Sequence, residues 1–299
     1  MPAPVRNPAT DIAWLILLAA VWGSSFAAIR VAVVEIPPMS LVAFRVVIGA
    51  LVLYAVMVAR GQRLPSGWAH WKMGFLLALV GIGMPFFLIG WGQTRVESGM
   101  AAILMAVMPL ATLVLAHFFN DGDRMTWGRL FGVAIGFGGV VVLVGPEALK
   151  GLGGDFPYQA AVAGGAFCYA LNAILTRNML PAPMLSRATM VMVAGAALSV
   201  VAALLLDGPY GLFVGAESLA AGVYLGVLPT GLATIVYFHL IEARGATFFS
   251  FVNYLNPVFG VMWGAALLGE ALTATALGAL ATILLGIAVA NVKFGRGET

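Results

Sequence analysis

Long apolar stretches separated by short polar connections follow one another along the whole chain. We identify ten of them, at residues 11–34, 38–60, 71–93, 97–118, 126–145, 157–178, 185–206, 217–241, 245–268 and 273–293. An α-helix needs about 20 predominantly apolar residues to cross the hydrocarbon core of a bilayer. We therefore predict an all-α integral membrane protein with ten transmembrane helices.

The composition excludes an ordinary soluble domain. Hydrophobic residues make up 62% of the chain and charged residues 9%, whereas soluble domains carry roughly 45–50% and about 25%. The connections are too short to hold a soluble catalytic or nucleotide-binding domain. The first stretch is long enough to span a bilayer and no convincing cleavage site follows it, so we predict a retained helix instead of a signal peptide.

The positions of Lys and Arg predict the orientation, because basic residues next to a span are retained on the cytoplasmic side. With the amino terminus inside, most of them fall in cytoplasmic segments: Arg6, Arg60, Arg63, Lys72, Arg124, Arg129, Arg177, Arg187, Arg244, Lys293 and Arg296. The opposite side holds only Arg30, Arg95 and Lys150. We expect both termini to be cytoplasmic, and we expect no nucleic-acid partner.

The two halves of the chain share a pattern of residues. Matched positions lie 147 or 148 residues apart, and they are Pro109 with Pro257, Asp123 with Glu270, Thr126 with Thr273, Trp22 with Tyr169, Ser25 with Asn172, and Arg30 with Arg177. This pattern predicts two five-helix repeats, 11–145 and 157–293, joined by a loop at 146–156. An odd number of helices inverts the second repeat in the membrane, as in many secondary transporters.

Motifs for energy chemistry or metal binding are missing from the sequence. There is no GxxxxGK[ST] phosphate loop and no HExxH, and His70, His117 and His239 are scattered. All Asp and Glu residues fall at or near the predicted helix ends, whereas proton-coupled carriers usually hold an ionisable group inside the membrane. We expect a protein that is not an enzyme and holds neither cofactor nor metal; proton coupling stays open.

Four prolines interrupt predicted helices: Pro85, Pro109, Pro229 and Pro257. Each removes a backbone hydrogen bond to the carbonyl four residues earlier, and in a bilayer such a carbonyl must face protein or a wet cavity. The prolines either form packing kinks or act as hinges around a central cavity. Glycines of the fifth and tenth spans, among them Gly132, Gly136, Gly138, Gly278 and Gly286, indicate close helix contacts in an outer scaffold or a dimer interface.

Polar and aromatic side chains near mid-depth are candidates for a substrate site. The candidates are Trp22, Ser25, Met84, Phe86, Tyr169, Asn172, Tyr237, Asn253 and Tyr254. An unpartnered amide in hydrocarbon is costly, so these groups either bind substrate or hydrogen-bond between helices. Arg45 is the one charge well inside a span, and it either gates, supports packing or binds a substrate carboxylate.

The chain resembles the drug/metabolite transporter superfamily, specifically its ten-span EamA-type members. The residues that carry the resemblance are Trp22-Gly-Ser-Ser-Phe26, Arg45, and the run Pro257…Gly269-Glu270…Thr273…Gly278 with its weaker echo at Pro109. The resemblance implies export of small metabolites through a cavity between the two halves. It is nearest to YddG-type exporters of aromatic and apolar amino acids, although members of the superfamily also move nucleotide sugars, purines and drugs.

We therefore expect a secondary exporter of amino acids in a bacterial inner membrane, working by alternating access. The alternatives are an exporter of drugs or other metabolites and a channel, which would need a continuous polar pore. The expected partners are a small-molecule substrate and membrane lipid, with the protein a monomer or weak homodimer.

Overall fold

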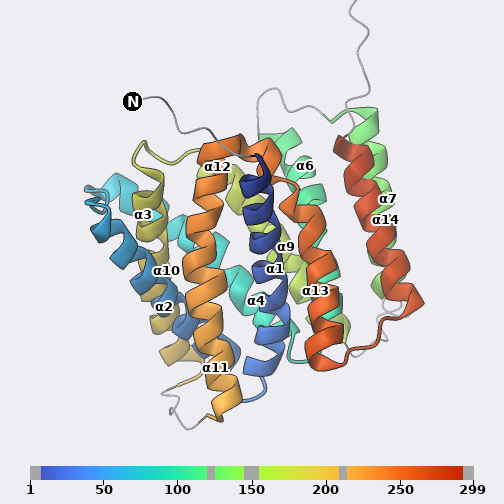
Figure 1. Cartoon of the computed structure of the whole chain (residues 1–299), viewed down its shortest axis with the longest axis horizontal. Helices are drawn as coiled ribbons and strands as arrows, with labels where there is room; N and C mark the ends of the chain where they lie inside the picture. The colour runs from blue at the N-terminus through green and yellow to red at the C-terminus, as the bar shows by residue number, and fades with distance from the viewer. Residues whose placement is uncertain (1–7, 120–124, 145–154, 209–213, 292–299) are drawn as a thin grey trace, which may run out of the picture.

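The computed structural model describes residues 8–119, 125–144, 155–208 and 214–291, and regular structure in these ranges is helical (Figure 1). The first half holds α1 (Pro8–Ala32), α2 (Pro38–Ala59), α3 (Trp68–Ala78), the π-helix η1 (Leu79–Gly83), α4 (Met84–Gly92), α5 (Ser98–Met105), α6 (Met108–Phe119) and α7 (Trp127–Val144). The second half holds α9 (Phe156–Thr176), α10 (Met184–Leu206), α11 (Ala216–Leu225), the π-helix η2 (Gly226–Leu232), α12 (Ala233–Phe249), α13 (Val252–Leu268) and α14 (Ala274–Asn291). Asp123 and most of the predicted loop 146–156 lie outside the described residues.

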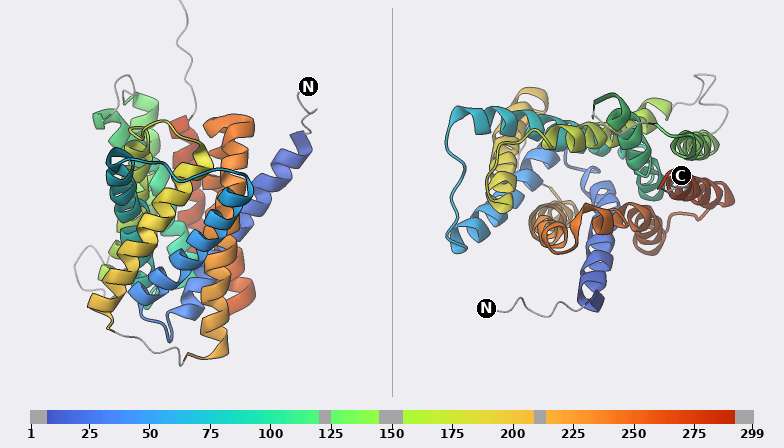
Figure 2. Two further views of the ribbon diagram at one scale, coloured as in Figure 1. Left: turned by 90° about the vertical axis from the view of Figure 1, so that its left-hand side faces the viewer. Right: turned by 90° about the horizontal axis from the view of Figure 1, so that it is seen from above.

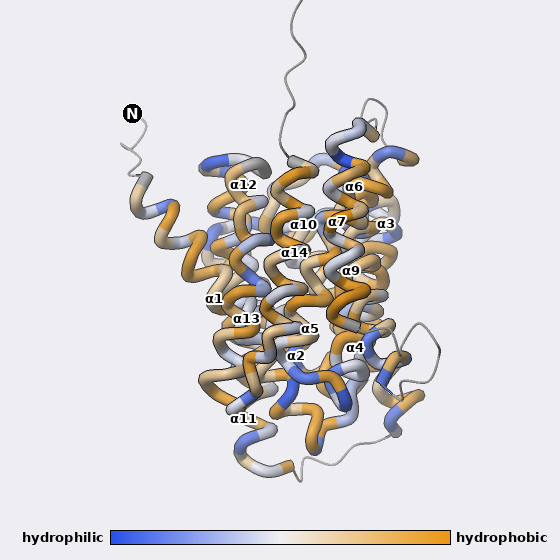
Figure 3. Tube along the Cα trace, turned by 90° about the vertical axis from the view of Figure 1, so that its right-hand side faces the viewer, coloured by the Kyte–Doolittle hydropathy of each residue, from blue (hydrophilic) through white to orange (hydrophobic). Residues whose placement is uncertain are grey.

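The prediction of an all-α membrane protein is confirmed. Within the described residues, 7 helices or runs of adjacent helices are long and apolar enough to cross a membrane: Ala9–Ala32, Pro38–Ala59, Trp68–Gly92, Ser98–Phe119, Phe156–Thr176, Met184–Leu206 and Ala216–Gly245. Three further predicted stretches contain shorter apolar helices, at Trp127–Leu143, Val252–Leu268 and Ala274–Ala290. Hydrophobic residues follow the long axes of the helices, and hydrophilic residues gather toward the ends (Figure 3).

Three of the four prolines lie at or next to a helix interruption, and the fourth lies within a helix. Pro85 follows the π-helix η1, and Pro229 lies inside the π-helix η2. Pro109 lies just after the break between α5 and α6, and Pro257 lies inside α13. Because proline cannot donate the hydrogen bond that continues an α-helix, a wider π turn or a break is the expected response.

The predicted span 245–268 differs from the observed structure. Its first residues continue α12 across a bend at Gly245, and α13 begins only at Val252. Gly245 has φ 81°, a conformation that glycine adopts readily because it has no Cβ. The bend turns the chain before the second helix starts.

Helices from the two halves pack directly against each other. α1 packs against α13 and α11, α2 packs against α10, and α9 packs against α4 and α6. A hydrogen bond of 3.0 Å from the indole Nε1 of Trp263 to the carbonyl of Ala20 joins α13 to α1. The centre of the molecule is therefore enclosed by elements from both halves.

A separate pair of helices, α7 and α14, lies at one edge of the molecule (Figures 1 and 2). Their backbones approach closely at Gly132, Gly136 and Gly286, where an added Cβ would collide with backbone atoms or a leucine of the neighbouring helices. Gly138 and Gly278 have open space at the Cβ position. The predicted close contact is present, but only some of the glycines make it.

Candidate functional site

A cavity of about 600 Å³ lies at the centre of the molecule. Its walls come from α1, α2, α9, α10 and α12 and from all four segments that carry the interrupting prolines. Most of the lining is apolar or aromatic, with a few polar groups between, as is usual for pockets that bind small organic molecules.

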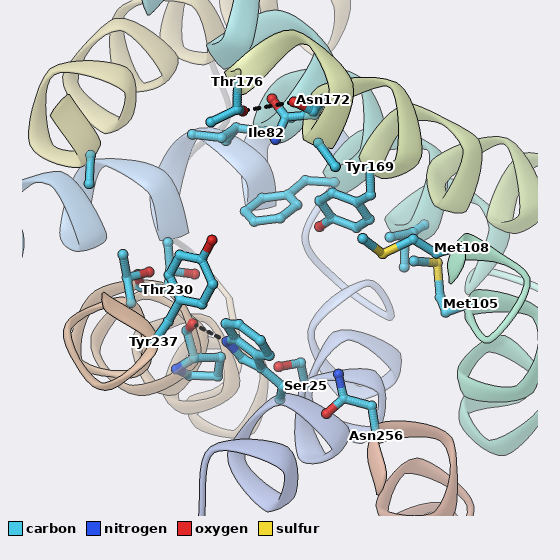
Figure 4. A pocket seen from close by; sticks show the side chains of 18 of the residues that line it. Ser25, Ile82, Met105, Met108, Tyr169, Asn172, Thr176, Thr230, Tyr237 and Asn256 are labelled. Carbon is cyan, nitrogen blue, oxygen red and sulfur yellow. Dashed lines mark hydrogen bonds between the residues drawn. The ribbon is translucent and has the colours of Figure 1, made fainter. Parts of the chain in front are cut away.

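Most of the predicted site residues meet at this cavity. Those lining it are Trp22, Ser25, Arg45, Phe86, Pro109, Tyr169, Asn172, Pro229, Tyr237, Asn253 and Pro257. Tyr169 and Tyr237 lie on opposite walls with their hydroxyl groups directed into the open space, and Ser25 lies on a third side beside Asn256 (Figure 4). Residues far apart in the sequence thus form one continuous surface.

Three predicted residues do not line the cavity. Met84 is 44% exposed and lies outside it. Tyr254 packs against the apolar cluster that contains Val261, and its ring centroid is 6.3 Å from that of Phe251. Pro85 is buried behind the wall, next to α9. In an α-helix neighbouring residues point about 100° apart, so Phe86 and Asn253 line the cavity while Met84 and Tyr254 do not.

Trp22 connects α1 to the π-helix η2. Its indole Nε1 donates a hydrogen bond of 3.0 Å to the carbonyl oxygen of Pro229, drawn in Figure 4. The Trp22 ring lies 6.1 Å from the ring of Tyr237 and 6.0 Å from that of Phe249, measured between centroids. Trp22 therefore forms part of the aromatic wall of the cavity and also hydrogen-bonds to an interrupted helix.

Arg45 is buried in the cavity wall, with 5% of its surface exposed. Its Nε and Nη2 atoms donate hydrogen bonds of 3.2 and 3.1 Å to the hydroxyl of Thr230. The guanidinium carbon lies 4.0 Å from the centroid of the Phe86 ring, a cation–π geometry. Phe86 in turn lies 6.5 Å from the ring of Tyr169, so the arginine is held among neutral groups.

Five polar residues of the wall were not predicted as site residues: Thr176, Arg187, Thr230, Thr234 and Asn256. The Oδ1 atom of Asn256 and the Nε atom of Arg187 are buried without a hydrogen-bond partner in the described part of the chain. The spacing in the sequence could have identified Asn256, because Asn256 and Pro257 follow Asn253 by three and four residues and so lie on the same helical face. The contact between Thr230 and Arg45 joins residues 185 positions apart and has no local signal.

The cavity extends toward one face of the molecule. Its lining includes Thr176, Met179 and Met184, from the face on which α9 ends and α10 begins, and Thr176 is exposed. We refer to this as the α9-end face. The cavity is therefore accessible from that side.

Hydrogen bonds close the opposite face, on which α1 ends and α5 begins. Arg30 Nη1 donates to the carbonyl of Gln93 at 2.6 Å, and Gln93 Nε2 donates to the carbonyl of Phe26 at 2.8 Å. The hydroxyl groups of Ser24 and Tyr224 lie 2.5 Å apart. Since these contacts join different helices, they hold the helices together between the cavity and that face and so close the cavity on this side.

The fold agrees with comparisons against known proteins. The EamA-like transporter family model matches residues 10–145 and again 158–292. The chain belongs to the EamA-like transporter family. The family is part of the drug/metabolite transporter superfamily, so the resemblance inferred from the sequence is confirmed.

Relatives of this EamA-family chain are named as transporters. The uncharacterised inner membrane transporter YedA of Escherichia coli is 28% identical over 287 residues, covering 93% of this chain and 89% of YedA. A probable terminal-alkyne amino-acid exporter of Streptantibioticus cattleyicolor is 28% identical over 280 residues, covering 91% of each chain. The chain is accordingly a multi-pass inner membrane protein.

A solved crystal structure has the same fold. It matches with a TM-score of 0.67 and 25% sequence identity, covering 95% of this chain and 97% of the other. The similarity extends over nearly the whole length of both chains.

Proposed function

We propose that this protein is a secondary transporter that exports small metabolites, with apolar and aromatic amino acids as its substrates. The observation that carries the proposal is the central cavity, which is accessible from the α9-end face and sealed toward the other. Its volume of about 600 Å³ lies within the range of small-molecule sites, roughly 300–1,000 Å³.

We further propose ten transmembrane helices in two inverted repeats, 11–145 and 157–293, with both termini cytoplasmic. The distribution of Lys and Arg supports this orientation. The α9-end face is then cytoplasmic, and the described conformation is open to the inside. Exchange of conformation between two inverted repeats would open the cavity to the outside.

The interrupted helices supply the movable parts of this mechanism. π turns and breaks lie at or next to Pro85, Pro109 and Pro229, and Pro257 interrupts the hydrogen bonding of α13. A helix with a missing hydrogen bond bends at lower cost than a continuous one. We propose these four prolines as hinges and Trp22, Ser25, Phe86, Tyr169, Asn172, Tyr237 and Asn253 as substrate contacts.

One relative and the residues that line the cavity support amino acids as the substrates. The Streptantibioticus cattleyicolor protein is named as a probable amino-acid exporter. The cavity presents aromatic rings for an apolar side chain, and amide and hydroxyl groups for the polar end of an amino acid. These features suit an amphipathic organic molecule better than an inorganic ion.

Uptake into liposomes tests the proposal. Purified protein is reconstituted, and the entry of labelled phenylalanine, threonine and methionine is measured with and without a pH gradient, against protein-free liposomes. Saturable flux without a gradient establishes a facilitative amino-acid carrier, and flux only with a gradient establishes proton coupling. If none of the three shows saturable flux, the assignment of amino acids is wrong.

A further inference from the structure

The charges that line the cavity have a single sign. Arg45 and Arg187 are the charged residues of its wall, and no Asp, Glu or His is present among the described lining residues. A low-dielectric cavity with one sign of charge concentrates ligands of the opposite sign. The lining therefore favours an anion and disfavours a cation.

Arg45 has no counter-charge in the described part of the protein. Its guanidinium is held by the neutral hydroxyl of Thr230 and the neutral ring of Phe86. Removing an isolated charge from water is costly unless an opposite charge compensates it. A ligand that brings a negative charge to this position would supply the compensation that the protein does not.

The geometry of Arg45 suits a carboxylate. Its Nε and Nη2 both donate to Thr230, while no described residue accepts a hydrogen bond from Nη1. Guanidinium groups bind carboxylates through strong charge-assisted hydrogen bonds. The Thr230 contact fixes the side chain in place, so the Nη1 edge is oriented before a ligand arrives.

The surroundings of Arg45 suit an apolar body attached to that carboxylate. Phe86 lies directly against the guanidinium, and Tyr169 lies against Phe86. Met105 and Met108 line the wall beside Tyr169 (Figure 4). Methionine side chains adapt to apolar ligands of different shape.

Arg187 adds a second positive group between the α9-end face and the centre. Its Nε atom is buried without a hydrogen-bond partner among the described residues. Asn256 offers a carbonyl oxygen that is also buried and unpartnered, and this oxygen can accept a hydrogen bond from an ammonium group. The ammonium group of an amino acid can therefore be accommodated by a hydrogen bond to this oxygen. However, no carboxylate among the described lining residues is present to form an ion pair with it.

We propose that the cavity selects organic anions, with an apolar body and a carboxylate that binds Arg45, and that an ammonium group on the ligand is not required. The inference rests on the proposed function in so far as the cavity is the transport site. It implies that carboxylates without an amino group are ligands, whereas apolar amines are rejected.

A series of four ligands tests the inference on the unaltered protein. The heat of binding to the protein in nanodiscs is measured for phenylalanine, 3-phenylpropanoate, phenylalaninamide and 2-phenylethylamine. The first two carry a carboxylate, and the last two share the same ring without it. We expect both carboxylates to bind at least tenfold more tightly than both amines. Binding of an amine as tight as that of 3-phenylpropanoate, or no binding of either carboxylate, overturns the inference.

Variants locate the effect at Arg45. Arg45→Gln is expected to weaken 3-phenylpropanoate binding at least tenfold, and Arg45→Lys, which keeps the charge, less than that. Arg63→Gln is the matched control, because Arg63 is exposed and lies outside the cavity. Equal affinity of Arg45→Gln and Arg63→Gln for the anion overturns the assignment. If Arg45→Gln does not fold, the ligand series still decides the selectivity.

Failure of anion selection can be distinguished from failure of amino-acid export. Amino-acid export fails if labelled phenylalanine does not cross the liposome membrane, whatever binds. Anion selection fails if amines bind as well as acids, whether or not phenylalanine crosses. Binding of 3-phenylpropanoate without flux of phenylalanine would keep the anion site and redirect the substrate search to organic acids that have no amino group.

Discussion

The carboxylate of Glu270 caps the helix that begins at Ser98, although the two residues are 172 positions apart. Glu270 Oε1 accepts a hydrogen bond of 2.7 Å from the backbone N–H of Ser98, and Oε2 accepts bonds from the Ser98 hydroxyl at 2.9 Å and the Gly99 N–H at 2.8 Å. An anion at a helix amino terminus satisfies free N–H groups and interacts well with the helix dipole. The contact joins the two halves of the chain on the face toward which the cavity is sealed.

Replacement of this carboxylate is expected to loosen the sealed face. Glu270→Ala removes all three hydrogen bonds, and leaving a buried donor unpaired costs about 1–3 kcal/mol. Because these bonds hold the sealed face together, we expect a larger fraction of Glu270→Ala molecules to be in a conformation open to the outside. The reporter is Ile29→Cys in a Cys168→Ser background, because Ile29 lines the cavity and is buried. Labelling by a membrane-impermeant thiol reagent from outside should be several-fold faster in Glu270→Ala.

Glu217→Ala is the control for the labelling experiment. Glu217 is an exposed acid in the first turn of α11, so its loss removes a comparable charge at a helix amino terminus without breaking a contact between the halves. Its labelling rate should equal that of the parent. Equal rates for Glu270→Ala and the parent would mean that Glu270 stabilises the fold without controlling access.

Two tryptophans that make the same kind of hydrogen bond separate stability from substrate binding. Trp22 donates to Pro229 in the cavity wall, and Trp263 donates to Ala20 outside it, each at 3.0 Å. Trp22→Phe and Trp263→Phe should each lower the free energy of unfolding by about 1 kcal/mol. We expect only Trp22→Phe to raise the KM for transport, by several-fold. Comparable changes in KM for both variants would argue that Trp22 acts through packing alone.

A pair of glycines in the same π-helix tests the position of Asn172. A Cβ added at Gly81 would collide with the side-chain carboxamide of Asn172, whereas the nearest atom to a Cβ at Gly83 is 3.7 Å away. Gly81→Ala should therefore push Asn172 into the cavity and reduce substrate affinity several-fold, with little loss of stability because a side chain can move. Gly83→Ala should leave affinity unchanged, and binding measurements on both variants check this.

The sequence predicts the helices and much of the cavity because both signals are local or repeated. Apolar length identifies the spans, and the match between the halves points to Trp22 with Tyr169 and to Ser25 with Asn172. All four of these residues line the cavity. Matched positions that both carry an aromatic ring, or both carry a polar group, therefore mark side chains that lie at one site.

What the sequence could not predict depends on helix phase and on distant contacts. Whether Met84 or Phe86 faces inward depends on the π turn at η1, which rotates the residues that follow it. The bend at Gly245 delays the start of α13 and so decides which face of it carries Asn253. The pairing of Arg45 with Thr230 exists only once α2 has packed against η2.

The close contact between the edge helices α7 and α14 makes stability sensitive to the size of the residue at position 286. A Cβ at Gly286 would lie 2.5 Å from the backbone nitrogen of Gly136 and 2.6 Å from the carbonyl oxygen of Gly132. Because backbone atoms cannot move aside as a side chain can, Gly286→Ala should separate the helices and lower stability by about 1–3 kcal/mol. Gly278→Ala in the same helix meets open space and should be neutral or slightly stabilising, since alanine favours helix over glycine. Thermal unfolding of both purified variants in one detergent compares them, and equal midpoints would show that the close contact of α7 with α14 does not limit stability.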